Sequence, residues 1–196
     1  RDGLLAGVPA ARTIAAMDPS SSPHRPPDSA RLFVALWPGP AVRDALVAQQ
    51  ALWHWPAGVR PVAPERLHLT LHFLGAVPDD RFEAVAAALA LGPSAPIELR
   101  LDRGEVWPRG IAVLGPAAVP PALTALHARL AGALTGAGVT PESRPYRPHV
   151  TLARHADGAV PPAAAPAVVW QAEGHALVES CRAPQAGYRV LRRYPG

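Results

Sequence analysis

The sequence predicts an α+β fold of antiparallel strands and helices. Short apolar stretches typical of strands and amphipathic stretches typical of helices follow each other in mixed order, which favours antiparallel pairing over a parallel α/β sheet. The 196-residue chain is 49% hydrophobic and 17% charged, so it can bury a sizeable core. No apolar run approaches the roughly 18 residues that cross a bilayer, and we therefore expect no membrane partner.

The first 30 residues predict a flexible N-terminal tail. Prolines recur there beside the run Ser20–Ser22, with no sustained periodicity. Met17 is the only methionine and a candidate for the natural start, which would make the residues before it non-native. We expect residues 1–30 to form this tail and residues 31–196 to form a single domain.

The first half of the predicted domain contains two strands and two helices. Residues 32–36 predict a buried strand, because this apolar run stops at a Trp-Pro-Gly-Pro sequence. Residues 41–53 carry apolar side chains at roughly helical spacing and predict a helix, and residues 67–74 predict the next strand. Residues 80–91 predict an alanine-rich helix that ends at a Gly-Pro pair.

The second half of the predicted domain is richer in strands. Residues 97–107 and 111–114 predict two strands joined by a Pro-Arg-Gly turn, and residues 121–135 predict a helix with leucines on one face. The remaining predicted strands cover residues 148–154, 168–181 and 187–193. The sequence therefore predicts about seven strands and three helices.

Arginine supplies all 19 basic residues, because the chain has no lysine. Against 15 acidic residues the net charge is only +4, although the sequence pI is about 10.2. This balance permits an anionic partner such as RNA, but no run of basic residues demands one. The single cysteine, Cys181, has no partner for an internal disulfide, fits a reducing cytoplasmic location and is expected to be a buried, inert thiol.

Two of the predicted strands carry the same polar pair. His68 precedes Thr70 and His149 precedes Thr151, with one aliphatic residue between the two members of each pair and a leucine after each threonine. Because side chains alternate between the faces of a strand, each histidine shares a face with its threonine. If the aliphatic face is buried in the core, both polar pairs face a cleft.

Two histidine–threonine pairs suit the cleavage of a phosphodiester without a metal ion. Histidine titrates near pH 6.5, so one imidazole can be neutral while another is protonated. The neutral ring can take a proton from an attacking water, and the protonated ring can give one to the departing oxygen. Threonine hydroxyls can donate hydrogen bonds to the phosphoryl oxygens, where negative charge accumulates. In-line displacement places the two imidazoles on opposite sides of phosphorus.

The sequence flanking both pairs extends the pattern to several further segments. These segments are residues 31–36, 64–75, 144–154, 179–182 and 187–191. In them the chain resembles the RNA 2′,3′-cyclic phosphodiesterase branch, also called 2′-5′ RNA ligase-like, of the two-histidine (2H) phosphoesterase superfamily. The resemblance spans about residues 31–194 and does not include the predicted tail.

The resemblance implies a bilobal α+β fold, with two pseudo-symmetric lobes of antiparallel sheet and helices around a central cleft. It implies that the protein opens the 2′,3′-cyclic phosphate at an RNA end to a 2′-phosphomonoester, with no metal or cofactor, and we expect a monomer. A 2′-5′ RNA ligase and a phosphodiesterase for a small cyclic nucleotide are alternatives within the enzyme class. A non-catalytic module that binds RNA ends is the alternative from another class.

The resemblance also implies roles for individual residues. His68 would donate a proton to the leaving 3′ oxygen, His149 would accept a proton from water, and Thr70 and Thr151 would hold the phosphate. The sequence itself does not distinguish the two imidazoles. Arg154 matches an arginine that contacts substrate, although strict alternation aims it away from His149 unless the strand ends there or the side chain wraps back.

Three further residues could have a function in the cleft. His72 is either a third imidazole of the cleft or a strand residue that faces solvent, and we expect the second. Phe33 and Tyr146 are candidates for stacking on a base, although Phe33 suits the core equally well. A metal site formed by His68, His72 and His149 would need a further ligand, usually a carboxylate, and we expect none.

Overall fold

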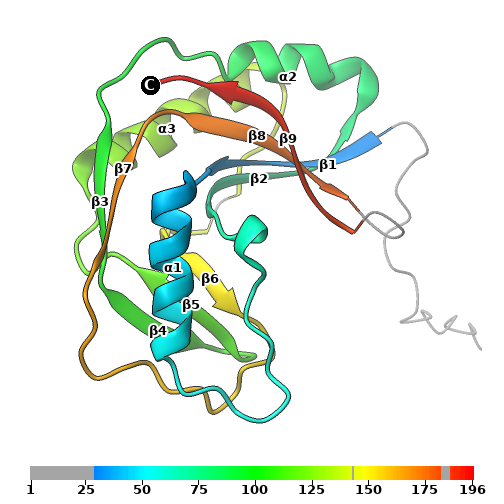
Figure 1. Cartoon of the computed structure of the whole chain (residues 1–196). Helices are drawn as coiled ribbons and strands as arrows, with labels where there is room; N and C mark the ends of the chain where they lie inside the picture. Colours follow the sequence, from blue (N-terminus) through cyan, green and yellow to red (C-terminus); the bar gives the residue numbers. More distant parts are fainter. Residues whose placement is uncertain (1–28, 143, 182–185) are drawn as a thin grey trace, which may run out of the picture.

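A computed structural model describes residues 29–196 except residue 143 and residues 182–185, and its secondary structure is mixed (Figure 1). Its strands are β1 (Ser29–Leu36), β2 (Leu69–Pro78), β3 (Ile97–Leu101), β4 (Arg103–Trp107), β5 (Ile111–Gly115), β6 (Val150–Ala153), β7 (Val168–Ala172), β8 (His175–Cys181) and β9 (Gly187–Tyr194). Its α-helices are α1 (Pro40–Leu52), α2 (Phe82–Ala88) and α3 (Pro121–Gly136), and its 3₁₀ helices are η1 (Pro64–Arg66) and η2 (Asp79–Arg81). The predicted tail lies outside the described residues, except that its last two residues begin β1.

Seven strands form one antiparallel sheet in the order β4-β5-β6-β2-β1-β8-β9, and β3 pairs with β7 in a separate two-stranded sheet. The neighbours β2 and β6 carry the two motifs, and they meet through the pair Leu69 and Val150. The large sheet is therefore joined across its middle by a short contact between these two strands. The predicted antiparallel α+β class is confirmed, and its division into two pseudo-symmetric lobes stays a prediction.

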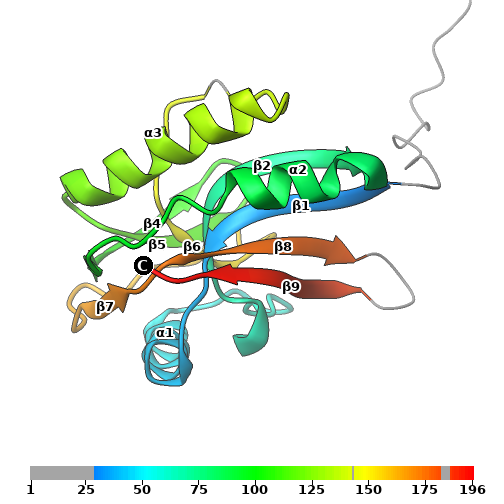
Figure 2. The same cartoon turned by 90° about the horizontal axis from the view of Figure 1, so that it is seen from above.

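Helices cover both sides of the seven-stranded sheet. Figure 2 shows α2 and α3 on one side and α1 on the other. The face of α3 that packs into the core is built from leucines spaced three or four residues apart, which are Leu123, Leu126, Leu130 and Leu134. Among the described residues, no helix combines the length and the apolar character needed to span a membrane.

Two of the predicted strands are each divided between the two sheets. Residues 97–107 form β3 and β4, and residues 168–181 form β7 and β8, so the described part of the chain has nine strands instead of about seven. At the first division the backbone N–H of Asp102 donates to the carbonyl of Gly115 at 3.1 Å. At the second division Gly174 has φ of +80°, and a Cβ there would collide with the facing backbone. These turns depend on tertiary contacts that periodicity does not reveal.

The helix predicted at residues 80–91 is shorter than expected. Its first turn is the 3₁₀ helix η2, and α2 covers only Phe82–Ala88. The chain leaves the helix before Gly92, whose φ of +80° favours glycine. The other two predicted helices agree with α1 and α3 to within one residue at each end.

Candidate active site

A cavity of about 710 Å³ contains both histidine–threonine pairs. His68 and Thr70 line it from the β2 side, and His149 and Thr151 line it from the β6 side. The structure therefore brings together four residues that come from two distant parts of the sequence. We call this cavity the two-histidine pocket.

Leu69 and Val150, the buried pair that joins β2 to β6, also determine where the neighbouring histidine and threonine side chains point. β2 begins at Leu69 and β6 begins at Val150, so each histidine stands directly before its strand and not inside it as the sequence predicted. Both Leu69 and Val150 have no exposed surface. Because side chains alternate along a strand, burial of these two residues turns the flanking histidines and threonines to the opposite face.

Each imidazole is held by a backbone carbonyl two residues earlier. The Nδ1 atom of His68 lies 2.7 Å from the carbonyl oxygen of Arg66, and Nδ1 of His149 lies 2.7 Å from the carbonyl oxygen of Arg147. A carbonyl oxygen can only accept, so Nδ1 carries the hydrogen in both rings. Nε2 is then free to accept a proton in the neutral ring and to donate one in the imidazolium.

Aromatic rings surround His68. The Trp37 indole stacks on its imidazole with a centroid separation of 5.4 Å and an interplanar angle of 12°. The Phe33 ring lies 5.0 Å away at a tilt of 38°, and the Tyr188 ring lies 5.0 Å away almost perpendicular to the imidazole. Phe33 and Tyr188 also line the two-histidine pocket. His68 is therefore fixed from several directions by apolar contacts.

Burial lowers the pKa of His68 to about 4, because an imidazolium loses its hydration in this aromatic environment. The carbonyl of Arg66 opposes this effect by accepting the Nδ1 hydrogen. The positive charges of His149, Arg154 and Arg66 lower the pKa further. In the free protein at neutral pH, His68 is therefore uncharged.

His149 lies beside a charged network instead. The Trp107 ring is 4.4 Å from the His149 imidazole at an angle of 62°, and its Nε1–H donates to Oε2 of Glu105 at 2.7 Å. The Arg147 guanidinium lies 4.2 Å from the centroid of the Trp107 ring and 3.1 Å from Oε2 of Glu105. Burial lowers the pKa of His149, and the charges of Arg147 and Arg154 act in the same direction.

The charged side chains of the two-histidine pocket are mostly cationic. Its lining arginines are Arg31, Arg60, Arg66, Arg144 and Arg154. One lining carboxylate, Glu142, accepts a hydrogen bond from Nε of Arg144 at 2.9 Å. β6 ends at Ala153, so Arg154 escapes the alternation of the strand and reaches the pocket. The excess of positive charge suits an anionic ligand.

A β-bulge in β2 places His72 and Phe73 on the faces of the strand opposite to those that the sequence predicts. The pairs Val34–His72 and Ala35–Thr70 leave Leu71 as an extra residue in β2. His72 is consequently only 3% exposed, and its prediction as a solvent-facing residue is wrong. Phe73, which alternation places in the core, is 56% exposed and lines the two-histidine pocket. The sequence carries no signal for this exchange, because the bulge depends on the register with β1.

Tyr146, a candidate from the sequence for stacking on a base, is not among the residues that line the two-histidine pocket. Its ring stacks on His127 of α3 at 3.9 Å, and His127 stacks on His72 at 3.9 Å. Nε2–H of His72 donates to the carbonyl oxygen of His127 at 2.9 Å. Burial raises the pKa of the Tyr146 hydroxyl. These three rings, the His72–His127–Tyr146 stack, form a layer between α3 and the first motif strand.

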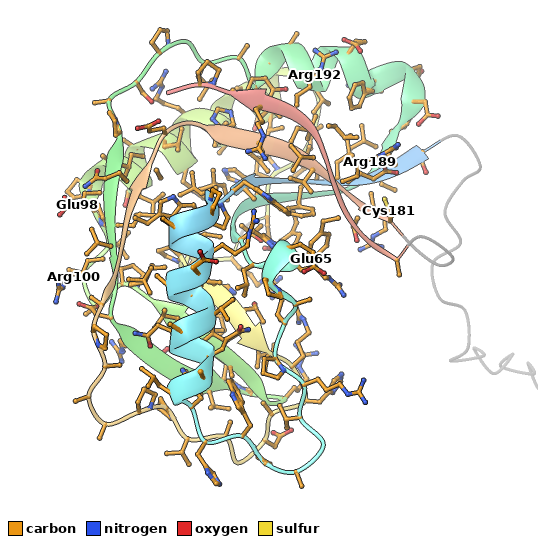
Figure 3. The ribbon with its side chains drawn as sticks, viewed as in Figure 1. Glu65, Glu98, Arg100, Cys181, Arg189 and Arg192 are labelled. Carbon is orange, nitrogen blue, oxygen red and sulfur yellow. The ribbon has the colours of Figure 1, made fainter. Side chains whose placement is uncertain are left out.

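The alternative metal site required His68, His72 and His149 to lie together. His72 does not line the pocket that contains the other two. Among the described residues, no three His, Cys, Asp or Glu side chains gather as metal ligands would. Cys181 ends β8, as Figure 3 shows, and it is half-buried instead of buried as expected. It is not among the residues that line the pocket.

Comparison with known sequences identifies relatives over most of the chain. The family model of the 2′-5′ RNA ligase superfamily matches residues 48–182. A Thermus thermophilus protein named RNA 2′,3′-cyclic phosphodiesterase is 35% identical over 182 residues, which are 84% of this chain and 89% of that protein. An Escherichia coli protein of the same name is 34% identical over 131 residues, which are 66% of this chain and 74% of that protein.

Solved structures agree with these sequence matches. Escherichia coli LigT in complex with NADP+ has a TM-score of 0.74 and 29% identity, and the match covers 86% of this chain and 98% of LigT. LigT in complex with 3′-AMP gives a TM-score of 0.72 at 27% identity, over 85% of this chain and 98% of LigT. The family predicted from the motifs is thereby confirmed, and the chain belongs to the 2′-5′ RNA ligase superfamily of 2H phosphoesterases.

Proposed function

We propose that this protein is an RNA 2′,3′-cyclic phosphodiesterase, which hydrolyses the cyclic phosphate at an RNA end to a 2′-phosphomonoester without a metal ion. The observation that carries the proposal is the pair of imidazoles, each with Nδ1 held by a carbonyl and Nε2 free, in one cationic pocket. Two relatives above 30% identity that bear this name support it.

In the proposed reaction each histidine has one role. Nε2 of His149 takes a proton from water, the water oxygen forms a bond to phosphorus, and the bond from phosphorus to O3′ breaks. Nε2–H of His68 gives its proton to O3′, so the product carries a 3′ hydroxyl and a 2′-phosphate. The hydroxyls of Thr70 and Thr151 donate to the non-bridging oxygens. The resemblance to the family assigns the donor and the acceptor.

Substrate binding brings the charge that this reaction needs. In the free protein burial and neighbouring arginines lower the pKa of both imidazoles, so neither is protonated at neutral pH. A cyclic phosphodiester carries one negative charge, and its arrival between the rings favours an imidazolium. The protein therefore takes up a proton as it binds substrate, and His68 is the ring that we propose to receive it.

The remaining walls of the pocket suit a nucleotide. The exposed ring of Phe73 offers an aromatic surface against which a base can pack. Phe33 lies 6.2 Å from it and is only 3% exposed, so it supports this surface from within the core. Arg154 lies close enough to influence the titration of both histidines, which supports a role for it in contacting the phosphate. Because the pocket opens to solvent, it also admits a longer RNA chain, whose phosphates the arginines that line the pocket would attract.

The decisive test is hydrolysis of a 2′,3′-cyclic nucleotide in the presence of EDTA. We expect full turnover and a 2′-phosphate product, identified by ³¹P NMR against authentic 2′ and 3′ isomers. A 3′-phosphate product would contradict the proposed direction of opening. Activity that EDTA removes and a divalent ion restores would contradict the metal-independent mechanism.

The same pocket can also join a cyclic phosphate to a 5′ hydroxyl, when that hydroxyl attacks phosphorus in place of water and O3′ leaves as before. We propose hydrolysis as the main reaction, because water reaches an open pocket at far higher concentration than a second RNA end. Incubation of cyclic-ended and 5′-hydroxyl oligonucleotides distinguishes the two: a 2′-5′ joined product that outweighs hydrolysis would favour the ligase.

We further propose that the protein acts as a monomer in the cytoplasm. The single cysteine suits a reducing compartment, and one chain supplies both histidine–threonine pairs of the pocket. Light scattering coupled to size-exclusion chromatography tests the monomer, and a mass of twice the 20.5 kDa chain would contradict it.

A further inference from the structure

Trp37 lies behind the two-histidine pocket and is not one of its lining residues. It follows β1 directly and precedes α1, and it packs with the small cluster of apolar residues between β1, β8 and β9. Its indole is half-buried and lies nearly parallel to the His68 ring, at 12° and a centroid separation of 5.4 Å. This contact is the starting point for an inference that rests on the proposed function.

The stack limits how the His68 ring can rotate. The hydrogen bond from Nδ1 to the Arg66 carbonyl fixes one edge of the imidazole, but it leaves rotation about that bond open. A parallel indole on one face and the perpendicular ring of Tyr188 remove that freedom. Nε2 is consequently held in one direction, as proton transfer requires.

The Trp37 indole also favours the protonated, positively charged form of His68. The groups whose charges influence this imidazole are His149, Arg154 and Arg66, and each disfavours an imidazolium. The face of an indole carries negative electrostatic potential and attracts a cation stacked on it. Trp37 therefore opposes the cationic neighbours from the side that substrate does not occupy.

In the part of the chain that the structure describes, no aromatic ring stacks in parallel on His149, the second histidine of the pocket. Trp107 meets the His149 ring at 62°, so the two faces are not stacked, and its indole is tied to Glu105. The parallel stack is thus specific to the ring that we propose as proton donor. We propose that Trp37 is a positioning residue that orients His68 and stabilises its imidazolium form while it donates a proton.

The experiment compares Trp37→Leu and Trp37→Phe with the unchanged full-length protein. For Trp37→Leu we expect kcat for a 2′,3′-cyclic nucleotide to fall by about 3- to 10-fold, with KM within about twofold, because Trp37 does not touch substrate. Trp37→Phe keeps an aromatic face and should retain at least half of kcat. Trp55→Leu is the matched control, because Trp55 stacks on Trp53 at 5.1 Å and neither lines the pocket.

A titration of His68 by NMR provides a second, independent measurement. It is recorded with sulfate present as a stand-in for the phosphate, because the charge of sulfate stays constant over the pH range. We expect the pKa of His68 to be lower in Trp37→Leu by about 0.5 pH units, and to change less in Trp37→Phe. Trp55→Leu should leave it unchanged.

Several results would overturn the inference. A folded Trp37→Leu protein with unchanged kcat and unchanged His68 titration removes the positioning role. A rise in KM with kcat preserved would instead make Trp37 a contact for substrate. If Trp37→Leu does not fold, a Trp37→Phe protein that loses kcat as severely as a His68 variant would contradict a role carried by the aromatic face. If the unchanged protein hydrolyses no cyclic phosphate, the proposed function fails, whereas the NMR titration still tests the stack.

Discussion

The halves of the pocket around His68 and His149 share a local plan and differ in their neighbours. In both, the histidine precedes a strand, donates Nδ1–H to the carbonyl two residues earlier at 2.7 Å, and is followed by a threonine that faces the same cavity. Around His68 the neighbours are aromatic, whereas around His149 a tryptophan is linked to a carboxylate and a guanidinium.

Under the proposed function, this difference between the neighbours gives the two motifs different chemistry. The two motifs differ only in one buried aliphatic residue, Leu69 in the first and Val150 in the second, so the proposed distinction has to come from residues outside them. Enclosure of His68 lowers its pKa to about 4 in the free pocket, so under the proposed function its imidazolium forms only when bound phosphate raises that pKa. The network at His149 places positive and negative charges together, and its ring can accept a proton beside a carboxylate that compensates Arg147.

The largest expected effect is the loss of turnover when either ring is removed. We expect His68→Ala and His149→Ala each to lower kcat by about 10²- to 10⁴-fold, and the double variant to lose less than the product of the two, because both act in one step. Binding of a 2′-nucleotide product should weaken far less than turnover. Steady-state kinetics and calorimetry measure the two quantities.

His54→Ala is the matched control for these variants, because His54 is exposed and does not line the pocket. It should retain the activity of the unchanged protein. If both pocket variants kept their turnover, or if the unchanged protein bound cyclic-ended RNA and never turned it over, the molecule would be a binding module and not an enzyme.

The second prediction concerns pH. Since burial lowers the pKa of both rings in the free pocket, the bell-shaped profile of kcat/KM should have its optimum on the acid side of pH 6.5. Bound phosphate raises both pKa values, so the profile of kcat should lie at higher pH than that of kcat/KM. A flat profile between about pH 5 and 9, or a displacement in the opposite direction, would contradict catalysis by two histidines.

Much of this pocket can be predicted from the sequence, because the alternation of side chains between the two faces of a half-buried strand is a local property. It places His68 with Thr70 and His149 with Thr151, and the burial of their aliphatic neighbours follows from hydrophobicity alone. The aromatic cage of His68 is different, because Trp37 and Tyr188 reach it from β1 and β9 through the order of strands in the sheet.

The errors share a single physical origin. Where the register between strands changes, a periodic pattern assigns side chains to the wrong face, as the exchange of His72 and Phe73 shows. Tyr146, named from the sequence as a candidate for stacking on a base, stacks its ring on His127 of α3 and does not line the pocket. Each of these positions is decided by a partner segment that lies far away in the sequence.

The third prediction separates the two halves of the pocket by a smaller effect. Glu105→Gln removes the charge that compensates Arg147 and leaves an oxygen that can still accept from Trp107. We expect the pKa of His149 to fall by about 0.3 pH units, with kcat changed less than about threefold, because this network is partly exposed to solvent. The pH profile should therefore move only at the limb that belongs to His149.

Glu98→Gln controls for the general loss of one negative charge. Glu98 lies on β3, in the small sheet, where it accepts a hydrogen bond from Gln171 (Figure 3). It should leave both limbs of the profile in place. If Glu105→Gln moved the His68 limb as much as the His149 limb, the separation between an aromatic half and a charged half of the pocket would be wrong.

The smallest effect is expected at the His72–His127–Tyr146 stack, which links β2 through α3 to the segment before the second motif. His127 stacks on His72 beside the bulge at Leu71, and Tyr146 stands three residues before His149. Burial, with the nearby charge of His72, lowers the pKa of His127 to about 4. In the unfolded chain His127 becomes protonated near pH 6.5, whereas in the folded chain it becomes protonated only near pH 4. The free energy of unfolding therefore decreases as the pH falls across this interval.

His127→Phe tests this connection, because phenylalanine keeps a stacking ring and does not titrate. We expect the variant to lose less stability than the unchanged protein between pH 7.5 and 5, because it lacks the imidazole that takes up a proton on unfolding. Urea unfolding at the two pH values measures the difference. An equal loss in both proteins would show that His127 titrates normally in the folded state. A large change in kcat at pH 7.5 would show that the stack sets the spacing of the two halves, because His127 itself does not reach the pocket.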